Sequence, residues 1–344
     1  MGRPLQRGNG LNEKIAVIGG GSWGTTLAGL LAGKGHETIL WVFEEDLAQR
    51  MQATKVNDIY LPGHTLPDTL KVTHKLDEAV SGADIVLMVT PSHVLRTVLS
   101  QLAPSVRSDA CFVCASKGIE NDTLLTMHEV MEDVLPKEFH GRIACISGPS
   151  FAKEVCQKMP TAVSVACRDP QVALRVQAAF NTQYFRVYTN PDVTGVELGG
   201  ALKNVIAIAA GCSDGLGFGH NTRAALITRG LSEIARLGMA MGANPLTFSG
   251  LSGMGDLVLT CTGELSRNRT VGYKLGQGQK LGEILSEMKM VAEGVKTAKA
   301  AYGLAKKYGV TMPITQQVYN LLYEDKDPKS VVRELMTRGL KSEY

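Results

Sequence analysis

The segment from residue 19 to residue 24 carries a glycine pattern that can bind the pyrophosphate of a dinucleotide. It consists of Gly19, Gly20, Gly21, Ser22, Trp23 and Gly24. In the spacing G-x-G-x-x-G, the first glycine permits a tight turn, the second lets a ligand approach the backbone, and the third allows close helix packing. The same pattern also occurs in tight turns that bind nothing. Here an apolar strand candidate precedes it and a helix candidate follows it, which favours the dinucleotide site.

Lys203 is a lone lysine in an otherwise apolar helical run, Leu202–Ala210. Burial lowers the pKa of a lysine towards neutrality, where the amine can donate and accept protons. A lysine that extends from an amphipathic helix to solvent is the alternative from the residues alone. Asp256 ends a Gly-Met-Gly-Asp turn, where it could orient Lys203 or simply cap a helix. Thr260, four residues on, would share the helical face of Asp256.

Two further segments suit an anionic ligand. Lys117 follows the strand expected at Cys111–Ala115, at the carboxyl end of a sheet, where ligands gather. The triplet Ser266, Arg267 and Asn268 precedes a helical stretch. A hydroxyl, a guanidinium and an amide at a helix start suit a phosphate group. An exposed basic turn is the alternative for this triplet.

The end of the second expected strand bears on the choice between NAD and NADP. It reads Phe43, Glu44, Glu45, Asp46, and no basic residue follows before Arg50. Such an end would repel a 2′-phosphate, whereas a carboxylate can accept a hydrogen bond from a ribose 2′-hydroxyl. The sequence therefore favours NAD, with NADP possible. The same acids could also serve only as favourable charges at the start of the next helix.

The elements that would position these residues change in kind near residue 190. Up to there, short apolar runs alternate with helical periodicity, which predicts an α/β, Rossmann-like, doubly wound and mostly parallel sheet. Strands are expected at Ile15–Ile18, Thr38–Val42, Ile85–Val89, Cys111–Ala115, Ile143–Ser147, Ala162–Ala166 and Phe185–Tyr188. Helices are expected at Trp23–Lys34, Leu47–Thr54, Val94–Leu102, Leu124–Leu135 and Val172–Phe180.

Beyond residue 190 an all-helical domain is expected. Its clearest helices are Val193–Cys212, Arg223–Met241, Ala292–Tyr308 and Ile314–Tyr323. Four Asx-Pro pairs predict capped helix starts: Asp169-Pro170, Asn190-Pro191, Asn244-Pro245 and Asp327-Pro328. The expected division is a flexible tail over 1–12, a dinucleotide-binding domain over 13–190 and a substrate-binding domain over 191–344. The many glycines between 194 and 294 indicate a close approach of backbone there.

Composition excludes several classes of protein. The 344 residues are 44% hydrophobic and 20% charged, with a net charge of +3, which gives no electrostatic reason to expect nucleic-acid or membrane binding. The seven cysteines indicate free thiols, and Cys111 and Cys114 are expected to be buried in a strand. The histidines show no ligand spacing, so no metal is expected. The apolar run Val205–Ala210 is expected to be too short to span a bilayer.

Taken together, these segments resemble the NAD(P)-dependent glycerol-3-phosphate dehydrogenases of the bacterial type. The resemblance runs from Ile15 to about Leu335. It rests on the segments 19–25, Ser116-Lys117-Gly118, 147–152, 199–205, 253–257 and 266–269, in one order. The implied reaction is the reversible reduction of dihydroxyacetone phosphate to sn-glycerol 3-phosphate, which supplies phospholipid synthesis.

The resemblance also implies roles for individual residues. Lys203 would be the proton donor and acceptor, with Asp256, Lys117 and Thr260 beside it. The substrate residues would be Lys117, Gly148, Ser150, Lys203, Asn204, Asp256, Ser266, Arg267 and Asn268. The cofactor residues would be Gly19, Gly21, Ser22, Trp23, Gly24, Phe43, Lys117, Ala152, Arg267, Val291 and Glu293. A homodimer is expected as in the family. Because the sequence shows no targeting signal and no run long enough to span a bilayer, the protein is expected in the cytoplasm.

Two other classes stay open from the sequence. One is a related dehydrogenase of hydroxyacids or sugar acids, which would not need a phosphate site at Ser266–Asn268. The other is a dinucleotide-sensing protein without catalysis, which would have no reason to keep Lys203, Asp256 and Lys117 together.

Overall fold

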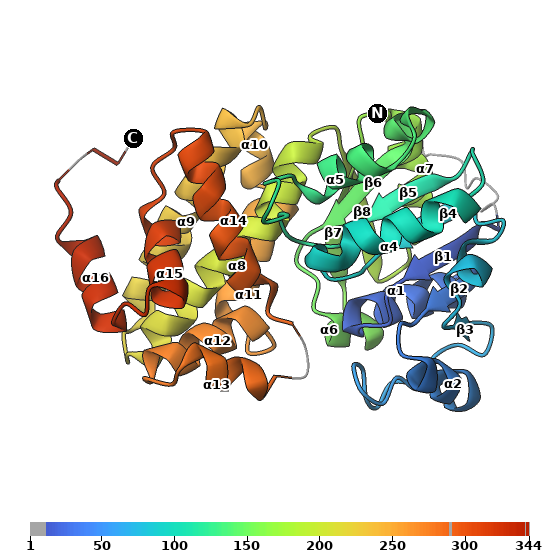
Figure 1. The fold of residues 1–344 in the computed structure, drawn as a ribbon, viewed down its shortest axis with the longest axis horizontal. Coiled ribbons are helices and arrows are strands. Elements are labelled where there is room, and N and C mark those ends of the chain that lie inside the picture. The colour runs from blue at the N-terminus through green and yellow to red at the C-terminus, as the bar shows by residue number, and fades with distance from the viewer. Residues whose placement is uncertain (1–11, 289–290, 341, 344) are drawn as a thin grey trace.

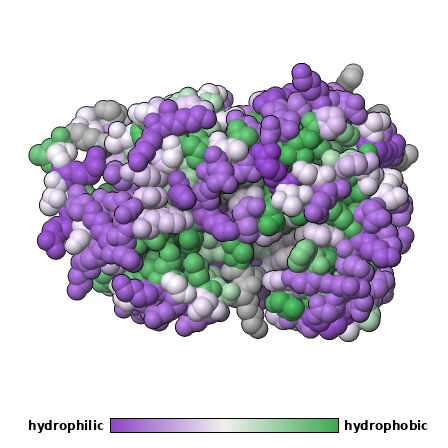
Figure 2. Space-filling view, in the orientation of Figure 1, coloured by the Kyte–Doolittle hydropathy of each residue, from purple (hydrophilic) through white to green (hydrophobic). Residues whose placement is uncertain are grey.

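The chain is folded into a sheet half and a helical half that lie side by side (Figure 1). The computed structural model describes residues 12–288, 291–340 and 342–343, so most of the tail expected over 1–12 lies outside the described residues. The sheet half ends with a strand at Asn190, and the helical half begins with a helix at Val193. Figure 2 shows hydrophilic side chains over most of one face of the molecule and apolar patches on the helical half.

The sheet half contains eight strands in the order β3-β2-β1-β4-β5-β6-β7-β8. Their bounds are β1 Lys14–Ile18, β2 Glu37–Trp41, β3 Lys71–Thr73, β4 Ile85–Met88, β5 Cys111–Cys114, β6 Ile143–Ser147, β7 Thr161–Ala166 and β8 Phe185–Asn190. Adjacent strands are parallel except for the pair β6–β7. The mostly parallel, doubly wound sheet is confirmed. Because β1 lies between β2 and β4, the strand order reverses there and opens a crevice at the carboxyl ends.

Helices cover both faces of this sheet. One face carries α1 Ser22–Gly33, α2 Glu45–Thr54 and α7 Pro170–Phe180, and the other carries α3 Leu76–Val80, α4 Leu95–Leu102 and α5 Met127–Val134. The short α6, Ala152–Cys156, packs against α1. Three 3₁₀ turns span Ser92–Val94, Ala103–Ser105 and Lys137–Arg142. Successive β1 residues alternate between the cores of the two faces, as the strand geometry requires.

The helical half is built around α8, Val193–Gly215, of which 18 of 23 residues are buried. Around it lie α9 His220–Ala240, α10 Pro245–Phe248, a π-helical turn Leu251–Gly255, α11 Asp256–Thr262, α12 Arg267–Gly276, α13 Leu281–Ser286, α14 Glu293–Lys307, α15 Pro313–Tyr323 and α16 Pro328–Met336. By length and composition α8 could cross a membrane, so the expectation that this run is too short is wrong. However, 83% of the apolar window of α8 is buried inside the protein, as in a core helix.

The glycines of the helical half let α8 and α12 touch through their backbones. A Cβ built on Gly211 would lie 2.0 Å from the Arg269 carbonyl oxygen, and one on Gly272 would lie 2.0 Å from that of Ile208. Gly215 and Gly276 face α12 and α8 in the same way, so we call these four positions the glycine seam. The expected close approach of backbone is therefore a contact between two helices.

Element bounds agree with the expectations to within a few residues, with two notable differences. Strand β3 was not expected, because it carries no apolar run: Lys71 is exposed, and Val72 and Thr73 are partly buried. Asn190-Pro191 does not cap α8: Asp192 accepts the hydrogen bond from Gly195 instead, and Asn190 closes a turn to the Asp192 nitrogen. The other three Asx-Pro pairs cap α7, α10 and α16 as expected.

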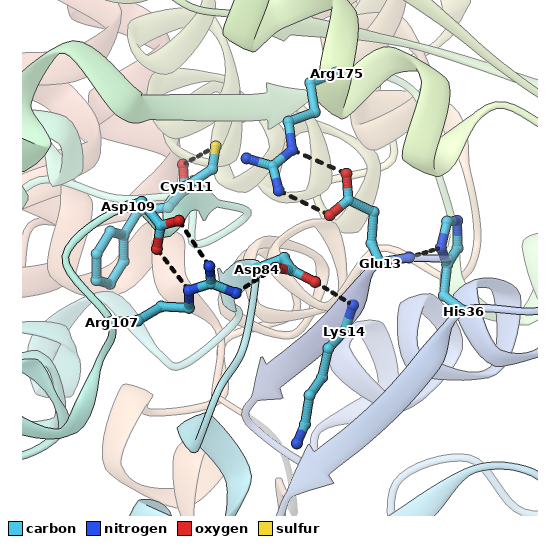
Figure 3. A network of polar contacts seen from close by, with 9 residues as sticks. Glu13, Lys14, His36, Asp84, Arg107, Asp109, Cys111 and Arg175 are labelled. Atoms are coloured by element: carbon cyan, nitrogen blue, oxygen red, sulfur yellow. Dashed lines mark hydrogen bonds and ion pairs between the residues drawn. The ribbon is translucent and has the colours of Figure 1, made fainter. Parts of the chain in front are cut away.

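A polar network fastens the amino ends of the strands, opposite the crevice (Figure 3). Arg175 of α7 donates two hydrogen bonds to Glu13, at 2.9 and 2.7 Å. Asp84 accepts from the Lys14 nitrogen at 2.8 Å and from Arg107 at 2.7 Å. These contacts hold the amino edge of the sheet and leave its carboxyl edge for ligands.

Candidate active site

The glycine-rich turn between β1 and α1 has the shape of a pyrophosphate cradle. Gly19 has a φ of +129°, and a Cβ there would lie 2.7 Å from the Val89 carbonyl oxygen. A Cβ on Gly24 would lie 1.9 Å from the Gly19 oxygen, whereas one on Gly21 would meet no atom within 4 Å. Gly19 and Gly24 must therefore be glycines for packing, whereas Gly21, the second glycine of the motif, faces open space.

The start of α1 also fits a dinucleotide. Gly21 stands at the N-cap and supplies no side-chain hydrogen bond to the first turn. The positive end of the helix dipole therefore faces the open side of Gly21, which suits a phosphate. Ser22 and Trp23 begin the helix, and Trp23 packs near Phe185 with ring centroids 6.4 Å apart. The residues present fit a dinucleotide cofactor.

The end of β2 lies beside this turn. Phe43 is 78% exposed and its ring meets Trp41 edge-on, at a centroid distance of 6.2 Å. Glu44 follows and is half-buried. Arg50 donates hydrogen bonds to Asp46 and Asp58 at 2.8 and 3.1 Å. The first basic residue after the strand is thus already held by two carboxylates.

A buried cluster of charged groups lies where the two halves meet. The Lys203 ammonium donates to Asp256 Oδ1 at 2.6 Å and to Thr260 Oγ1 at 2.8 Å. Asp256 opens α11, and Thr260 lies one turn later on the same face, as their spacing predicts. The Lys203 side chain is 9% exposed and that of Asp256 is 1% exposed. The lysine therefore sits in the core of the helical half rather than extending to solvent.

Lys117 brings the sheet half into this cluster. It follows β5, and its ammonium donates to Asp256 Oδ2 at 2.7 Å and to the Gly148 carbonyl oxygen at 3.4 Å. One carboxylate thus binds a lysine from each half of the molecule. Burial, reinforced by the positive charge of Lys117, lowers the pKa of Lys203 to about 8, although Asp256 opposes this shift. Such a pKa suits proton transfer near neutral pH.

The segment after β6 lines the same region. Gly148 has a φ of +147°, and a Cβ there would lie 2.9 Å from the Val163 Cα. Its carbonyl oxygen accepts from Ser150 Oγ at 3.0 Å. Ala152 begins α6, and its carbonyl oxygen lies 3.4 Å from Thr26 Oγ1 of α1. The segment therefore connects the lysine cluster to the glycine-rich turn.

Arg267 is a cation without a partner at the start of α12. Among the described residues it has no hydrogen bond or ion pair. Its side chain reaches solvent, yet surrounding protein removes enough water to lower the pKa of the guanidinium, against the opposing charge of Glu293. The neighbouring Ser266 Oγ accepts from the Arg269 nitrogen at 3.3 Å and caps the helix. An uncompensated guanidinium at a helix start is well placed to bind a phosphate.

Two asparagines join three helices behind this guanidinium. Asn268 donates from Nδ2 to Asn204 Oδ1 at 2.9 Å, and its own Oδ1 accepts from the Gly294 nitrogen at 2.9 Å. Both asparagines are buried. They therefore hold α8, α12 and α14 in fixed relation around Lys203 and Arg267.

Glu293, the first residue of α14, connects the helical half to the sheet half. Its carboxylate accepts from Ser92 Oγ at 2.6 Å and from the Ser92 nitrogen at 3.3 Å. Val291 precedes it and is 40% exposed. No hydrogen bond or ion pair of the Val291 backbone is found among the described residues. Glu293 lies near Arg267, and its negative charge partly offsets the lowering of the guanidinium pKa by burial.

The sequence analysis did not single out Ser92 or Ser147. Ser92 follows β4 at the carboxyl edge of the sheet, so the rule that selected Lys117 could have found it. Ser147 ends β6, and among the described residues its buried Oγ has no hydrogen-bond partner. Ser92 Oγ instead donates to Glu293, and Ser147 Oγ packs against Gly200 of α8.

Comparison with known proteins identifies the family. The family model described as the N-terminus of NAD-dependent glycerol-3-phosphate dehydrogenase matches residues 14–173, and the model for its C-terminus matches residues 192–333. The chain belongs to this glycerol-3-phosphate dehydrogenase family. It is accordingly an oxidoreductase that uses NAD or NADP.

Individual relatives agree with this assignment. The chain is 62% identical over 333 residues to the glycerol-3-phosphate dehydrogenase, NAD(P)+, of Geobacter metallireducens, covering 97% of this chain and 99% of that one. The Geobacter sulfurreducens enzyme of the same name gives the same identity and coverage. The crystal structure of the Coxiella burnetii glycerol-3-phosphate dehydrogenase superposes with a TM-score of 0.90 at 42% identity, over 95% of this chain and 99% of that one.

More distant structures share the fold alone. A ketopantoate reductase from Ralstonia eutropha superposes with a TM-score of 0.59 at 16% identity, over 92% of this chain. The same two-part architecture thus occurs in a protein named for different chemistry. The substrate must therefore be inferred from the site rather than from the fold.

Proposed function

We propose that this chain reversibly reduces dihydroxyacetone phosphate to sn-glycerol 3-phosphate and so supplies glycerol phosphate for phospholipid synthesis. The nicotinamide cofactor supplies or accepts the hydride when it is bound. Lys203 donates a proton to the ketone oxygen as the alcohol forms, and its neutral amine takes that proton back in the reverse direction. The observation that carries the proposal is the buried Lys203–Asp256–Lys117 cluster beside the unpartnered Arg267.

The groups around Lys203 orient it and tune its charge. Asp256 and Thr260 accept two of its hydrogen bonds, which fixes the direction of the ammonium. Lys117 adds a second positive charge that favours an oxygen carrying partial negative charge in the transition state. Gly148 and Ser150 lie beside Lys117 and would contact the substrate together with Asn204.

The phosphate group of the substrate would bind at the start of α12. Arg267 can donate two parallel hydrogen bonds to phosphate oxygens. The backbone nitrogens of the first turn add donors, and Ser266 and Asn268 hold that turn in place. A hydroxyacid carries a carboxylate but no phosphate, so it would not need a phosphate site at Ser266–Asn268; the helix-start donors together with Arg267 favour a phosphorylated ketone.

The cofactor would lie along the carboxyl edge of the sheet, with its pyrophosphate at Gly19–Gly24. Ala152, Val291 and Glu293 would lie along its nicotinamide half, within reach of Lys117 and Arg267. NADH is the expected choice over NADPH, because the ribose end offers Phe43 and an acidic stretch rather than a free cation.

The positions of these residues suggest which half of the molecule binds each ligand. Residues 13–190 would hold the dinucleotide and residues 191–344 the substrate. The seven cysteines all have free thiols, which supports a reducing compartment such as the cytoplasm.

A homodimer is proposed from the surface of the helical half. Helix α9 buries only five of its 21 residues. Met239 of α9 is 49% exposed, and Leu246 of the neighbouring α10 is 76% exposed. A second copy of the chain would cover this apolar surface, and sedimentation should then give twice the chain mass of 36.9 kDa.

An assay of the absorbance of the reduced nicotinamide tests the proposed reaction. Dihydroxyacetone phosphate should be reduced with NADH and more slowly with NADPH, whereas a 2-oxo acid of similar size should not be reduced. Turnover of the 2-oxo acid without turnover of dihydroxyacetone phosphate would favour the hydroxyacid dehydrogenase instead.

A further inference from the structure

The loop between α2 and β3 packs on the glycine-rich turn from outside the motifs that carry the family resemblance. It spans residues 55–66, and we call it the Asn57 loop. A bridge between Val56 and Thr65 and a hydrogen bond from the Leu66 nitrogen to the Lys55 oxygen at 2.7 Å close its neck. The loop is thus a compact surface loop with fixed ends, of the kind that often carries function.

The side chain of Asn57 is completely buried inside this loop and uses most of its hydrogen-bonding capacity. Its Nδ2 donates to the Gly20 carbonyl oxygen and to Thr25 Oγ1, both at 2.8 Å. Its Oδ1 accepts from the Tyr60 nitrogen at 2.9 Å. A buried amide held on both sides is costly to disrupt, so it fixes the position of its partners.

The contact of Asn57 with the Gly20 oxygen determines the direction of the Gly21 N–H, because both groups belong to one peptide. The carbonyl and the N–H of one trans peptide point in opposite directions. Because Asn57 holds the Gly20 oxygen on the protein side, the Gly21 N–H points to the open side of the turn. Among the described residues no acceptor binds the Gly21 nitrogen, and a Cβ on Gly21 would meet no atom. The peptide is therefore already oriented to donate to an anion.

The same loop reaches the ribose end of the site through Tyr60. The Tyr60 hydroxyl donates to Glu44 Oε1 at 2.7 Å, and its carbonyl oxygen accepts from Ser22 Oγ at 2.6 Å. Glu44 lies just beyond β2, where the adenosine ribose is expected. Hydrogen bonding to the carboxylate raises the pKa of Tyr60 to about 12, so the phenol stays a donor at physiological pH. Tyr60 thus fixes Oε1 of Glu44, and this also fixes the direction in which Oε2 can accept a hydrogen bond from the ribose.

We propose that Asn57 and Tyr60 are positioning residues for the dinucleotide: Asn57 presets the donor for its pyrophosphate, and Tyr60 aims Glu44 at the ribose of NADH. This inference rests on the proposed cofactor site. It adds a prediction that the motifs do not make, namely that a loop without direct catalytic groups controls both cofactor affinity and the choice between NADH and NADPH.

The test measures dissociation constants of NADH and NADPH by quenching of the two tryptophans, Trp23 and Trp41, which lie at this site. Tyr60→Phe should weaken NADH binding about fivefold or more and leave NADPH binding within about twofold, because it frees the carboxylate without touching the turn. Asn57→Ala should weaken both cofactors about tenfold or more, since both carry the pyrophosphate. In both variants kcat at saturating cofactor should stay within about twofold of wild type.

Thr65→Ala is the matched control, because Thr65 lies on the same loop, is exposed, and pairs with Val56 through its backbone rather than its side chain. It should change neither dissociation constant. Melting curves show whether each variant is folded, and if Asn57→Ala does not fold, Tyr60→Phe decides. Wild-type affinities in Tyr60→Phe, or in a folded Asn57→Ala, would overturn the inference while the proposed function stands. A wild type that binds neither cofactor would overturn the proposed function itself.

Discussion

At the scale of single residues, the charge state of Lys203 is expected to set how the rate of each direction of the proposed reaction depends on pH. Its pKa of about 8 means that the ammonium predominates below pH 8 and the neutral amine above it. Reduction of the ketone needs the ammonium, so its kcat should fall as pH rises through about 8. Oxidation of the alcohol needs the amine, so its kcat should rise over the same range. Profiles of kcat against pH in both directions measure this.

Lys203→Ala tests the same residue directly. Loss of a general acid should lower kcat by roughly 10²–10⁴ while NADH binding is retained. A variant that keeps more than a small fraction of its kcat, or shows the wild-type pH profile, would remove Lys203 from proton transfer.

Arg267 should act on substrate affinity rather than on the cofactor. Arg267→Ala removes a charge-assisted contact with phosphate worth about 1.5–3 kcal/mol, or roughly a ten- to hundredfold rise in KM for dihydroxyacetone phosphate. Kinetics at fixed saturating NADH measure that change. A collapse of NADH affinity with an unchanged KM for the ketone would instead assign Arg267 to the dinucleotide.

At the scale of elements, a buried carboxylate joins α8 to α5. Glu197 Oε1 accepts from the His128 nitrogen at 2.8 Å, and burial raises the pKa of Glu197 to about 7. The folded protein then holds a proton that the unfolded chain has lost, so this group's contribution to stability is present at acid pH and disappears as pH rises through about 7.

Glu197→Gln mimics the protonated form at every pH. Its melting temperature should exceed that of wild type at pH 8 and equal it near pH 5. The exposed Glu138→Gln serves as the control and should show no such difference. An equal effect of Glu197→Gln at both pH values would show that its carboxyl does not titrate in the fold.

The glycine seam makes a second prediction at this scale. Gly272→Ala would place a methyl group 2.0 Å from the Ile208 oxygen, so α12 must move away from α8. Stability should fall by about 1–3 kcal/mol, as for overpacking, and KM for the ketone should rise because Arg267 moves with α12. Gly282→Ala, in α13 with no atom near its Cβ, is the control and should be tolerated. Denaturant melts and kinetics compare the two variants.

The sequence predicts local patterns well and long-range contacts poorly. Every strand of the sheet except β3 follows from an apolar run, and the pairing of Asp256 with Thr260 follows from helical spacing. Strand β3 has no such run and exists because it pairs with β2. The contact of Asn57 with Gly20 joins residues 37 apart through a loop, and no periodicity indicates it. Three of the four Asx-Pro caps were predicted correctly; at Asp192 the neighbouring Asx-Pro pair offered an equally good local signal, and the cap at Thr126 was not predicted.

At the scale of the whole molecule, the site exists only where the two halves meet. Lys117 and the glycine-rich turn come from the sheet half, whereas Lys203, Asp256 and Arg267 come from the helical half. Glu293 and Ser92 add a second connection between the halves. The amino edge of the sheet is fastened separately by Glu13 and Arg175, so the ligands need not hold the sheet together.

Because Lys117 of the sheet half and Lys203 of the helical half bind the same carboxylate of Asp256, the pKa of Lys203 depends on the distance between the two halves. Any motion that parts the halves takes Lys117 away and lets water reach Lys203, and both changes raise its affinity for a proton. A ligand that draws the halves together should therefore release protons near pH 8, and by reciprocity alkaline pH should favour the closed arrangement. Calorimetric titration of NADH in buffers of different ionisation enthalpy would show this release, and Lys203→Met would abolish it. Heats that do not depend on the buffer would mean that binding leaves the distance between the two lysines unchanged.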